Sequence, residues 1–140
     1  MTDYLAAAKR GDWETAFGFF AQDIAVHIPG RSVFAGDLEG KMVAVNYIQA
    51  IRDHYRDGTI ELELIDMLVS EDRVALLVRE IFHGDGAPIE IRRANVYRVH
   101  GDEIVEISIF EGDQYVVDEL LRDVGPRPAV DRPDAPPPRM

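Results

Sequence analysis

The sequence predicts an α+β domain in which helices pack on one face of a mostly antiparallel sheet. Up to residue 58, apolar residues recur mainly at helical spacing, and only one short strand interrupts them. From residue 59 onward the apolar period changes to two, and turn sequences separate four long strands. Four twisted strands curl readily, so helices across the open side are expected to enclose a cavity.

The N-terminal helices are set by caps, breakers and apolar stripes. A first helix is expected over residues 2–10, ending at Gly11, and Asp12 is a good N-cap for a second helix. A third helix is expected to end near Gly58. The apolar stripes of the second and third helices are Trp13, Ala16, Phe17 and Phe20, and Met42, Val45, Ile48, Ile51 and Tyr55.

One short strand lies between the helices and four longer ones follow them. The first is "DIAVHI", which must stop near Pro29 and enter a long irregular loop. The others are "TIELELIDMLVS", "DRVALLVREIFHG", "PIEIRRANVYRV" and "IVEISIFEGD", with a hairpin turn at "DGA" and a last helix at "QYVVDELL". Asp66 interrupts the alternation of its strand, and a β-bulge explains this.

Composition divides the chain into one domain, residues 1–125, and a proline-rich tail, residues 126–140. Six of the eight prolines fall in the tail, which is expected to be disordered, although a proline-rich ligand for another domain is an alternative.

Charge and cysteine content exclude several functional classes. The net charge of −11 argues against nucleic-acid binding. No apolar run is long enough to cross a membrane, and the absence of cysteine fits a cytoplasmic protein. The four histidines are widely spaced and no glycine-rich phosphate loop is present, so neither a metal nor another cofactor is expected.

Polar residues that continue inward-facing apolar rows are the candidates for chemistry. In residues 89–99, Arg93 and Asn95 share a face with large apolar side chains. If that face points inward, each needs a partner or costs about 1–3 kcal/mol. The alternative is that the faces are reversed and Arg93 is solvated.

The last strand carries a similar pattern. The row of Val105, Ile107 and Ile109 continues in phase to Glu111 and Asp113. A carboxylate in an apolar cavity has a raised pKa and can act as a general acid or base near neutrality. Alternatively, Glu111 lies at the rim and Asp113 N-caps the following helix.

His27 precedes the forced strand end and is therefore expected at the mouth of the cavity. Its pKa lies where small shifts move it across neutrality. The alternative is an imidazole hydrogen-bonded within the loop "PGRSVFAGD".

In this order, the segments "GDWETAFGFFAQDIAVHIPG", "FAGDLEGKMVAVNYI", "RRANVYRVHGDEIVEISIF" and "DQYVVDELL" give the chain a family resemblance. Residues 2–122 resemble the nuclear-transport-factor-2-like superfamily, in particular its SnoaL-like and ketosteroid-isomerase-like members. The resemblance implies a cone-shaped, curved sheet with three N-terminal helices over its open side, commonly dimeric through the sheet face. Members include isomerases, polyketide cyclases, dehydratases, epoxide hydrolases and non-catalytic binders.

Residue roles carry over only in part. In the steroid isomerases a base carboxylate lies beside a Pro-Gly element, a position that falls here on Ile28, next to His27, and their oxyanion-binding aspartate falls on Asn95. The late-strand acid/base aspartate of the polyketide cyclases corresponds to Glu111 or Asp113. The arginine-flanked aspartate pair of the epoxide hydrolases is not apparent.

These observations predict a cofactor-independent enzyme that transfers protons on a largely apolar carbonyl substrate. His27, Glu111 or Asp113 would move the proton, and Arg93 and Asn95 would polarise the carbonyl. The apolar wall is expected from Trp13, Phe17, Tyr47 and Tyr97. The alternatives are a binding or assembly module with the same cavity, and an interaction platform that uses the outer sheet face.

Overall fold

The computed structural model describes residues 1–54, 60–84 and 86–124. Its helices are α1 (Thr2–Lys9), α2 (Trp13–Phe17), α3 (Lys41–His54) and α4 (Gln114–Leu121). Its strands are β1 (Phe20–Ile28), β2 (Gly36–Glu39), β3 (Ile60–Val69), β4 (Arg73–Phe82), β5 (Ile89–His100) and β6 (Glu103–Glu111). The expected end of the third helix near Gly58, the first residue of the "DGA" turn and the tail lie outside the described residues.

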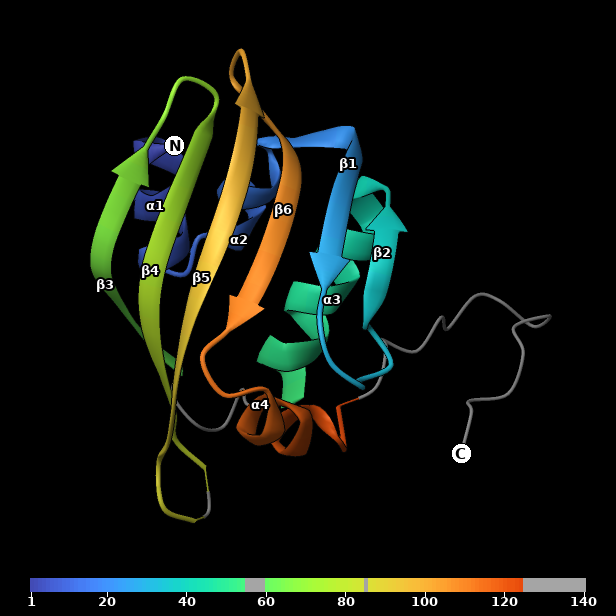
Figure 1. Ribbon diagram of the computed structural model, residues 1–140, viewed down its shortest axis with the longest axis vertical. Helices are drawn as coiled ribbons and strands as arrows, with labels where there is room; N and C mark the ends of the chain where they lie inside the picture. The colour runs from blue at the N-terminus through green and yellow to red at the C-terminus, as the bar shows by residue number, and fades with distance from the viewer. Residues whose placement is uncertain (55–59, 85, 125–140) are drawn as a thin grey trace, which may run out of the picture.

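The six strands form one curved sheet in the order β2-β1-β6-β5-β4-β3. The β1–β6 pair is parallel and the other neighbours are antiparallel. Helices α1, α2 and α3 lie on one face of the sheet, and α4 lies across one end (Figure 1). The predicted α+β architecture, a cone of bent sheet with helices over its open side, is confirmed. None of the helices within the described ranges has the length and apolarity needed to span a membrane.

Two elements differ from the sequence prediction. Strand β2 forms where a loop was expected, and pairs with residues 25–28 of β1. Phe20 begins β1 instead of ending α2, because it is buried in the core and pairs with Ile104 of β6. Helix α2 is therefore only five residues long.

Irregular pairing sets which side chains face inward. The predicted bulge is present in β3, where the register with β4 shifts between Leu64 and Asp66. A second shift, between Arg98 and Val99 of β5, changes the phase of β6. As a result Ile104 is buried in the core, and the expected inward position of Val105 is wrong.

Helix α4 is anchored at its N-terminus and against the loop that follows β1. The Asp113 carboxylate accepts hydrogen bonds from the backbone N–H groups of Tyr115 and Val116, at 3.1 and 3.3 Å. Gly30, with a φ of 97°, packs so closely against α4 that a Cβ there would collide with the side chains of Gln114 and Asp118. The Pro-Gly element therefore serves to seat the loop on α4.

Asp113→Ala is expected to lower the free energy of unfolding by about 1 kcal/mol, because two backbone donors lose their acceptor. Asp113→Asn should retain most of the stability, since asparagine is an equally good cap. Thermal or urea denaturation measures both. Equal stability of the alanine variant and the wild-type protein would show that the cap contributes nothing.

Candidate functional site

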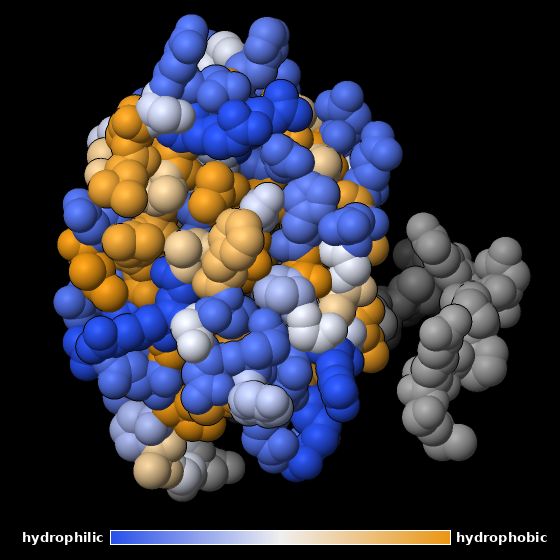
Figure 2. Space-filling model, in the orientation of Figure 1, coloured by the Kyte–Doolittle hydropathy of each residue, from blue (hydrophilic) through white to orange (hydrophobic). Residues whose placement is uncertain are grey.

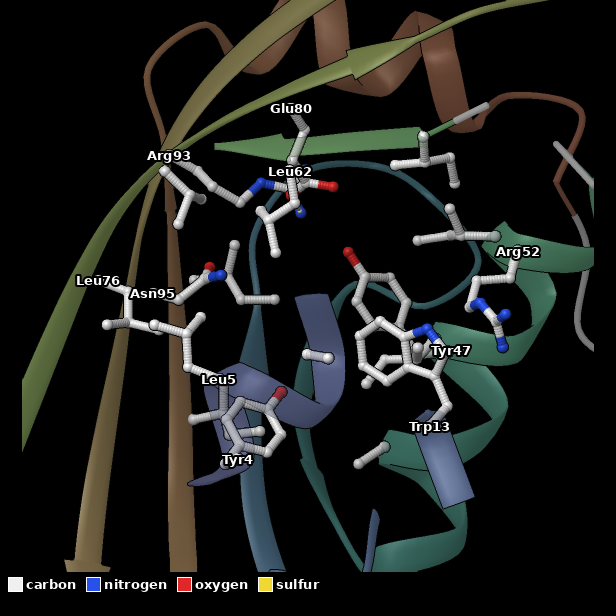
Figure 3. A pocket seen from close by; sticks show the side chains of 18 of the residues that line it. Tyr4, Leu5, Trp13, Tyr47, Arg52, Leu62, Leu76, Glu80, Arg93 and Asn95 are labelled. Carbon is white, nitrogen blue, oxygen red and sulfur yellow. Dashed lines mark ion pairs between the residues drawn. The ribbon is translucent and has the colours of Figure 1, made fainter. Parts of the chain in front are cut away.

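A pocket of about 490 Å³ lies between the concave face of the sheet and helices α1, α2 and α3. Most of its wall is apolar: Leu5 and Trp13 contribute from the helices, and Leu62, Leu76 and Ile109 from the sheet. Figure 3 shows that polar groups gather at the sheet end of this pocket. The site therefore combines a large apolar volume with a localised polar wall, as small-molecule pockets commonly do.

An arginine flanked by two carboxylates forms that polar wall. The Nε of Arg93 on β5 lies 3.0 Å from Oε1 of Glu111 on β6, and its Nη1 lies 3.3 Å from Oε1 of Glu80 on β4. The side chains of Arg93, Glu80 and Glu111 are 8%, 17% and 2% exposed. Arg93 and Glu111 are direct cross-strand partners, so the sheet register itself brings them together.

The cluster carries two negative charges and one positive charge in a poorly solvated place. Burial raises the pKa of Glu111, the nearby charge of Arg93 opposes that rise, and the charge of Glu80 adds to it. Burial, the largest single influence, would lower the pKa of Arg93, but the combined attraction of Glu80, Tyr47 and Glu111 outweighs it and the net direction is upward. Arg93 therefore stays charged, and with both glutamates ionised the three side chains together carry one surplus negative charge.

Two polar atoms beside this cluster have no hydrogen-bond partner within the described part of the chain. They are the hydroxyl oxygen of Tyr47 and Oδ1 of Asn95, both buried. Both residues line the pocket, and Figure 3 shows their polar groups directed into it. Burial raises the pKa of Tyr47 to about 12, so its hydroxyl keeps its proton at neutral pH and remains a donor.

Aromatic side chains build the rest of the wall. The rings of Tyr4 and Tyr97 lie 5.5 Å apart between centroids, and burial raises the pKa of each hydroxyl. On the helical side of the pocket the guanidinium carbon of Arg52 lies 5.4 Å from the centre of the Trp13 ring. This cation–π contact holds the indole in place as part of the pocket wall.

The structure brings most of the residues selected from the sequence to this pocket. Five of them line it: Trp13, Tyr47, Arg93, Asn95 and Tyr97. Glu111 is buried behind the wall and reaches the pocket only through Arg93. Phe17 lies instead in the core, where it packs against Trp13 and Phe20, and Asp113 is placed as the cap of α4.

The expected position of His27 at the cavity mouth is wrong. Val26 and Ile28 point into the core, so strand alternation turns His27 to the outer face of the sheet. There its Nδ1 lies 2.7 Å from Oδ1 of Asp37, and its Nε2 lies 2.8 Å from Oε2 of Glu106. Since carboxylates only accept hydrogen bonds, both contacts form only when the ring is an imidazolium.

Glu80 is the site residue that the sequence reasoning missed. It continues the inward row of Val74, Leu76 and Val78 on β4, as Glu111 continues that of β6. The same rule that selected Glu111 therefore selects Glu80 when it is applied to the neighbouring strand. Among the described residues, no group of three or more His, Cys, Asp or Glu side chains is arranged to hold a metal ion.

The His27 contacts predict a pH-dependent stability difference. Hydrogen bonds to Asp37 and Glu106 raise the pKa of His27 above its ordinary value of 6.5, and the His27 contact lowers the pKa of Glu106 below 4.5. The stabilisation from His27 is complete below pH 6.5 and is lost as the pH rises through the raised pKa. That from Glu106 is present above pH 4.5 and is lost on further acidification.

Wild-type protein is therefore expected to exceed His27→Gln in unfolding free energy most clearly between these values, and the difference should shrink above neutrality. Urea denaturation of both proteins across this pH range measures it. His54→Gln, which leaves the His27 contacts in place, serves as the histidine control. A difference that grows with rising pH would contradict the imidazolium assignment.

The fold and pocket define the class of protein: an α+β cone with a largely apolar pocket between the sheet and the helices. Residues 1–107 match the sequence profile of the SnoaL-like domain. The chain belongs to the SnoaL-like family, within the nuclear-transport-factor-2-like superfamily.

Solved structures support the same fold. A cystatin-like protein of unknown function from Xanthomonas campestris is 23% identical, with a TM-score of 0.76 over 86% of this chain and 93% of its own. Bal32a, from a soil-derived mobile gene cassette, is 26% identical, with a TM-score of 0.76 over 86% of this chain and 92% of its own. TerC, co-crystallised with polyporic acid, is 12% identical, with a TM-score of 0.71 over 87% and 95%. No curated protein matches the sequence.

Proposed function

We propose that the protein is an acid–base enzyme of the isomerase, cyclase or dehydratase type, which acts on a largely apolar carbonyl compound inside the pocket. The observation that carries this proposal is the position of Glu80. It is an ion-paired carboxylate of the Arg93 cluster that also lines an otherwise mostly apolar cavity. A carboxylate in such a place is within reach of a C–H bond next to a bound carbonyl group.

The reaction would begin with Glu80 accepting a proton from the carbon next to the carbonyl. Electron density moves onto the carbonyl oxygen, and the Tyr47 hydroxyl donates a hydrogen bond to it. Because Tyr47 is buried and keeps its proton, this donor is in place before the charge develops. Glu80 then returns the proton to another carbon or to a leaving oxygen.

Arg93 and Glu111 would position Glu80 without touching the substrate. When Glu80 takes up a proton, Arg93 keeps a charged partner in Glu111, 3.0 Å away. The cluster then passes from one surplus negative charge to neutrality and never leaves a buried guanidinium unpaired. An arginine paired with a single carboxylate would lose its only charged partner when that carboxylate took up a proton. This explains the presence of two carboxylates beside Arg93.

A binding module with the same pocket is the second candidate, and one observation favours it. The Glu80 carboxylate is already ion-paired with Arg93, 3.3 Å away, and this contact competes with any substrate for the carboxylate. TerC, a structural neighbour with this fold, was co-crystallised with polyporic acid. Turnover on ligands that bind distinguishes the two candidates.

Hydrogen–deuterium exchange tests the proposed proton transfer. Apolar ketones and β,γ-unsaturated ketones are incubated with the protein in D₂O, and loss of the proton next to the carbonyl is followed by NMR. The wild-type protein should accelerate exchange, and Glu80→Gln should reduce that acceleration by about 10²- to 10⁴-fold.

The matched control is Glu71→Gln, which removes an exposed carboxylate from the β3–β4 turn and should retain full activity. If ketones bind in the pocket but exchange no faster than in buffer, the enzyme proposal is wrong and the binding module remains.

We also propose that the outer face of the sheet forms a homodimer. Figure 2 looks onto this face and shows apolar side chains gathered across it, with charged groups around them. Exposed members include Phe110, which is 58% exposed, and Leu68, which is 54% exposed. Cross-strand ion pairs of both signs, including those of Arg79 and Arg98, lie on the same strands, so a twofold-related copy offers matching charges.

Phe110→Glu is expected to convert a dimer into a monomer, because it places a charge in the apolar part of the interface. Analytical ultracentrifugation measures the change. Tyr115→Glu, at an aromatic residue of α4 that is 89% exposed, is the control and should leave the dimer intact. A wild-type protein that sediments as a monomer at micromolar concentration would rule out this interface.

A further inference from the structure

The unpartnered polar atoms of the pocket restrict the chemical class of the ligand more than the apolar volume of the pocket does. The Tyr47 hydroxyl and Asn95 Oδ1 are buried and lack a hydrogen-bond partner among the described residues. Leaving each unpaired costs about 1–3 kcal/mol, so a ligand that pairs both recovers that energy on binding. The two atoms come from opposite walls, since Tyr47 lies on α3 and Asn95 on β5.

The two atoms need different hydrogen-bond partners on the ligand. An amide oxygen only accepts hydrogen bonds, so Asn95 Oδ1 requires a donor on the ligand. The Tyr47 hydroxyl has a proton to give, and its neighbour Arg93 is an ion-paired cation that offers no acceptor, so an acceptor on the ligand satisfies it. A ketone without a hydroxyl group leaves Asn95 unpaired, and an alcohol without a carbonyl group satisfies Tyr47 less well.

The charge of the polar wall excludes an anionic ligand group there. Glu80 and Glu111 together outnumber Arg93 by one charge. The Nε and Nη1 atoms of Arg93 already contact these carboxylates, so its positive charge is offset by two negative ones. A carboxylate or phosphate on the ligand would meet a surplus negative charge in a poorly solvated place. The polar end of the ligand is therefore neutral.

We infer that the pocket selects a hydroxy-carbonyl compound with a neutral polar end, whose carbonyl oxygen accepts from Tyr47 and whose hydroxyl group donates to Asn95. This inference rests on the proposed function only in taking the pocket as the binding site, and it specifies the substrate class. It concerns equilibrium binding, so it stands or falls separately from proton transfer by Glu80.

A set of matched probes tests it by isothermal titration calorimetry. The meta and para isomers of hydroxybenzophenone carry both groups, benzophenone carries only the carbonyl, the benzylphenols carry only the hydroxyl, and diphenylmethane carries neither. Titrations are done at a pH at which the phenol is neutral. Trp13 is the one tryptophan of the chain and lines the pocket, so its emission gives a second readout.

At least one hydroxybenzophenone isomer is expected to bind about fivefold more tightly than benzophenone and about fivefold more tightly than its benzylphenol, which corresponds to one ordinary hydrogen bond for each group. Tyr47→Phe should remove the preference for the carbonyl and keep that for the hydroxyl. Asn95→Leu should remove the preference for the hydroxyl and keep that for the carbonyl. Asn95→Asp keeps an acceptor and should therefore retain the preference for the hydroxyl.

The control variants Tyr115→Phe and Asn46→Leu make the same chemical changes at exposed positions and should alter neither preference. Equal affinities for the four probe types, or a hydroxyl preference that survives Asn95→Leu, would overturn the inference. Tight, selective binding without any exchange activity would support it while refuting the enzyme proposal. Rapid exchange without any preference for the hydroxyl would support the enzyme proposal and refute the inference about the ligand.

Discussion

The buried guanidinium of Arg93 is the constraint on which the rest of the site depends. It ties three consecutive strands together, through Glu80 on β4 and Glu111 on β6. A slip of one residue in any of these strands would turn its charged group to the opposite face and leave the others unpaired. Breaking a buried pair in this way costs about 3–5 kcal/mol, so the cluster specifies the strand register as well as the polar wall.

The apolar pocket and the charged cluster depend on each other. Side chains such as Leu76 and Ile109 limit the water beside the cluster, and this burial raises the pKa of both the Tyr47 hydroxyl and the Glu111 carboxyl group. In water the same groups would be an ordinary phenol and an ordinary carboxylic acid. The functional character of the wall therefore comes from where the sheet places these residues, more than from which residues they are.

The sequence predicted which side chains of a strand face inward, because this follows from alternation along the strand. It missed features that depend on pairing between distant segments of the chain. Period-two patterns placed Arg93 and Asn95 on the inner face, and the same rule would have found Glu80 on β4. Strand alternation also turns His27 outward. The position of His27 just before the proline that ends β1 had instead suggested that it lies at the mouth of the cavity. Strand β2 carries no apolar row, since its four residues are mostly exposed, so only its pairing with β1 reveals it. No local pattern shows that Tyr47 from a helix and Asn95 from a strand line the same pocket.

The two faces of the sheet carry similar charged groups with different consequences. Outside, His27, Arg98 and Glu106 form a chain of ion pairs that water reaches, and such pairs contribute about 0–1 kcal/mol each. Inside, Arg93 and its two glutamates are shielded, so adding or removing one proton changes the balance of the whole cluster. Protonation of the outer groups changes the stability of the fold. The inner cluster borders the pocket through Glu80 and Arg93, and this difference in solvent access supports the proposal that any proton transfer takes place on the inner face.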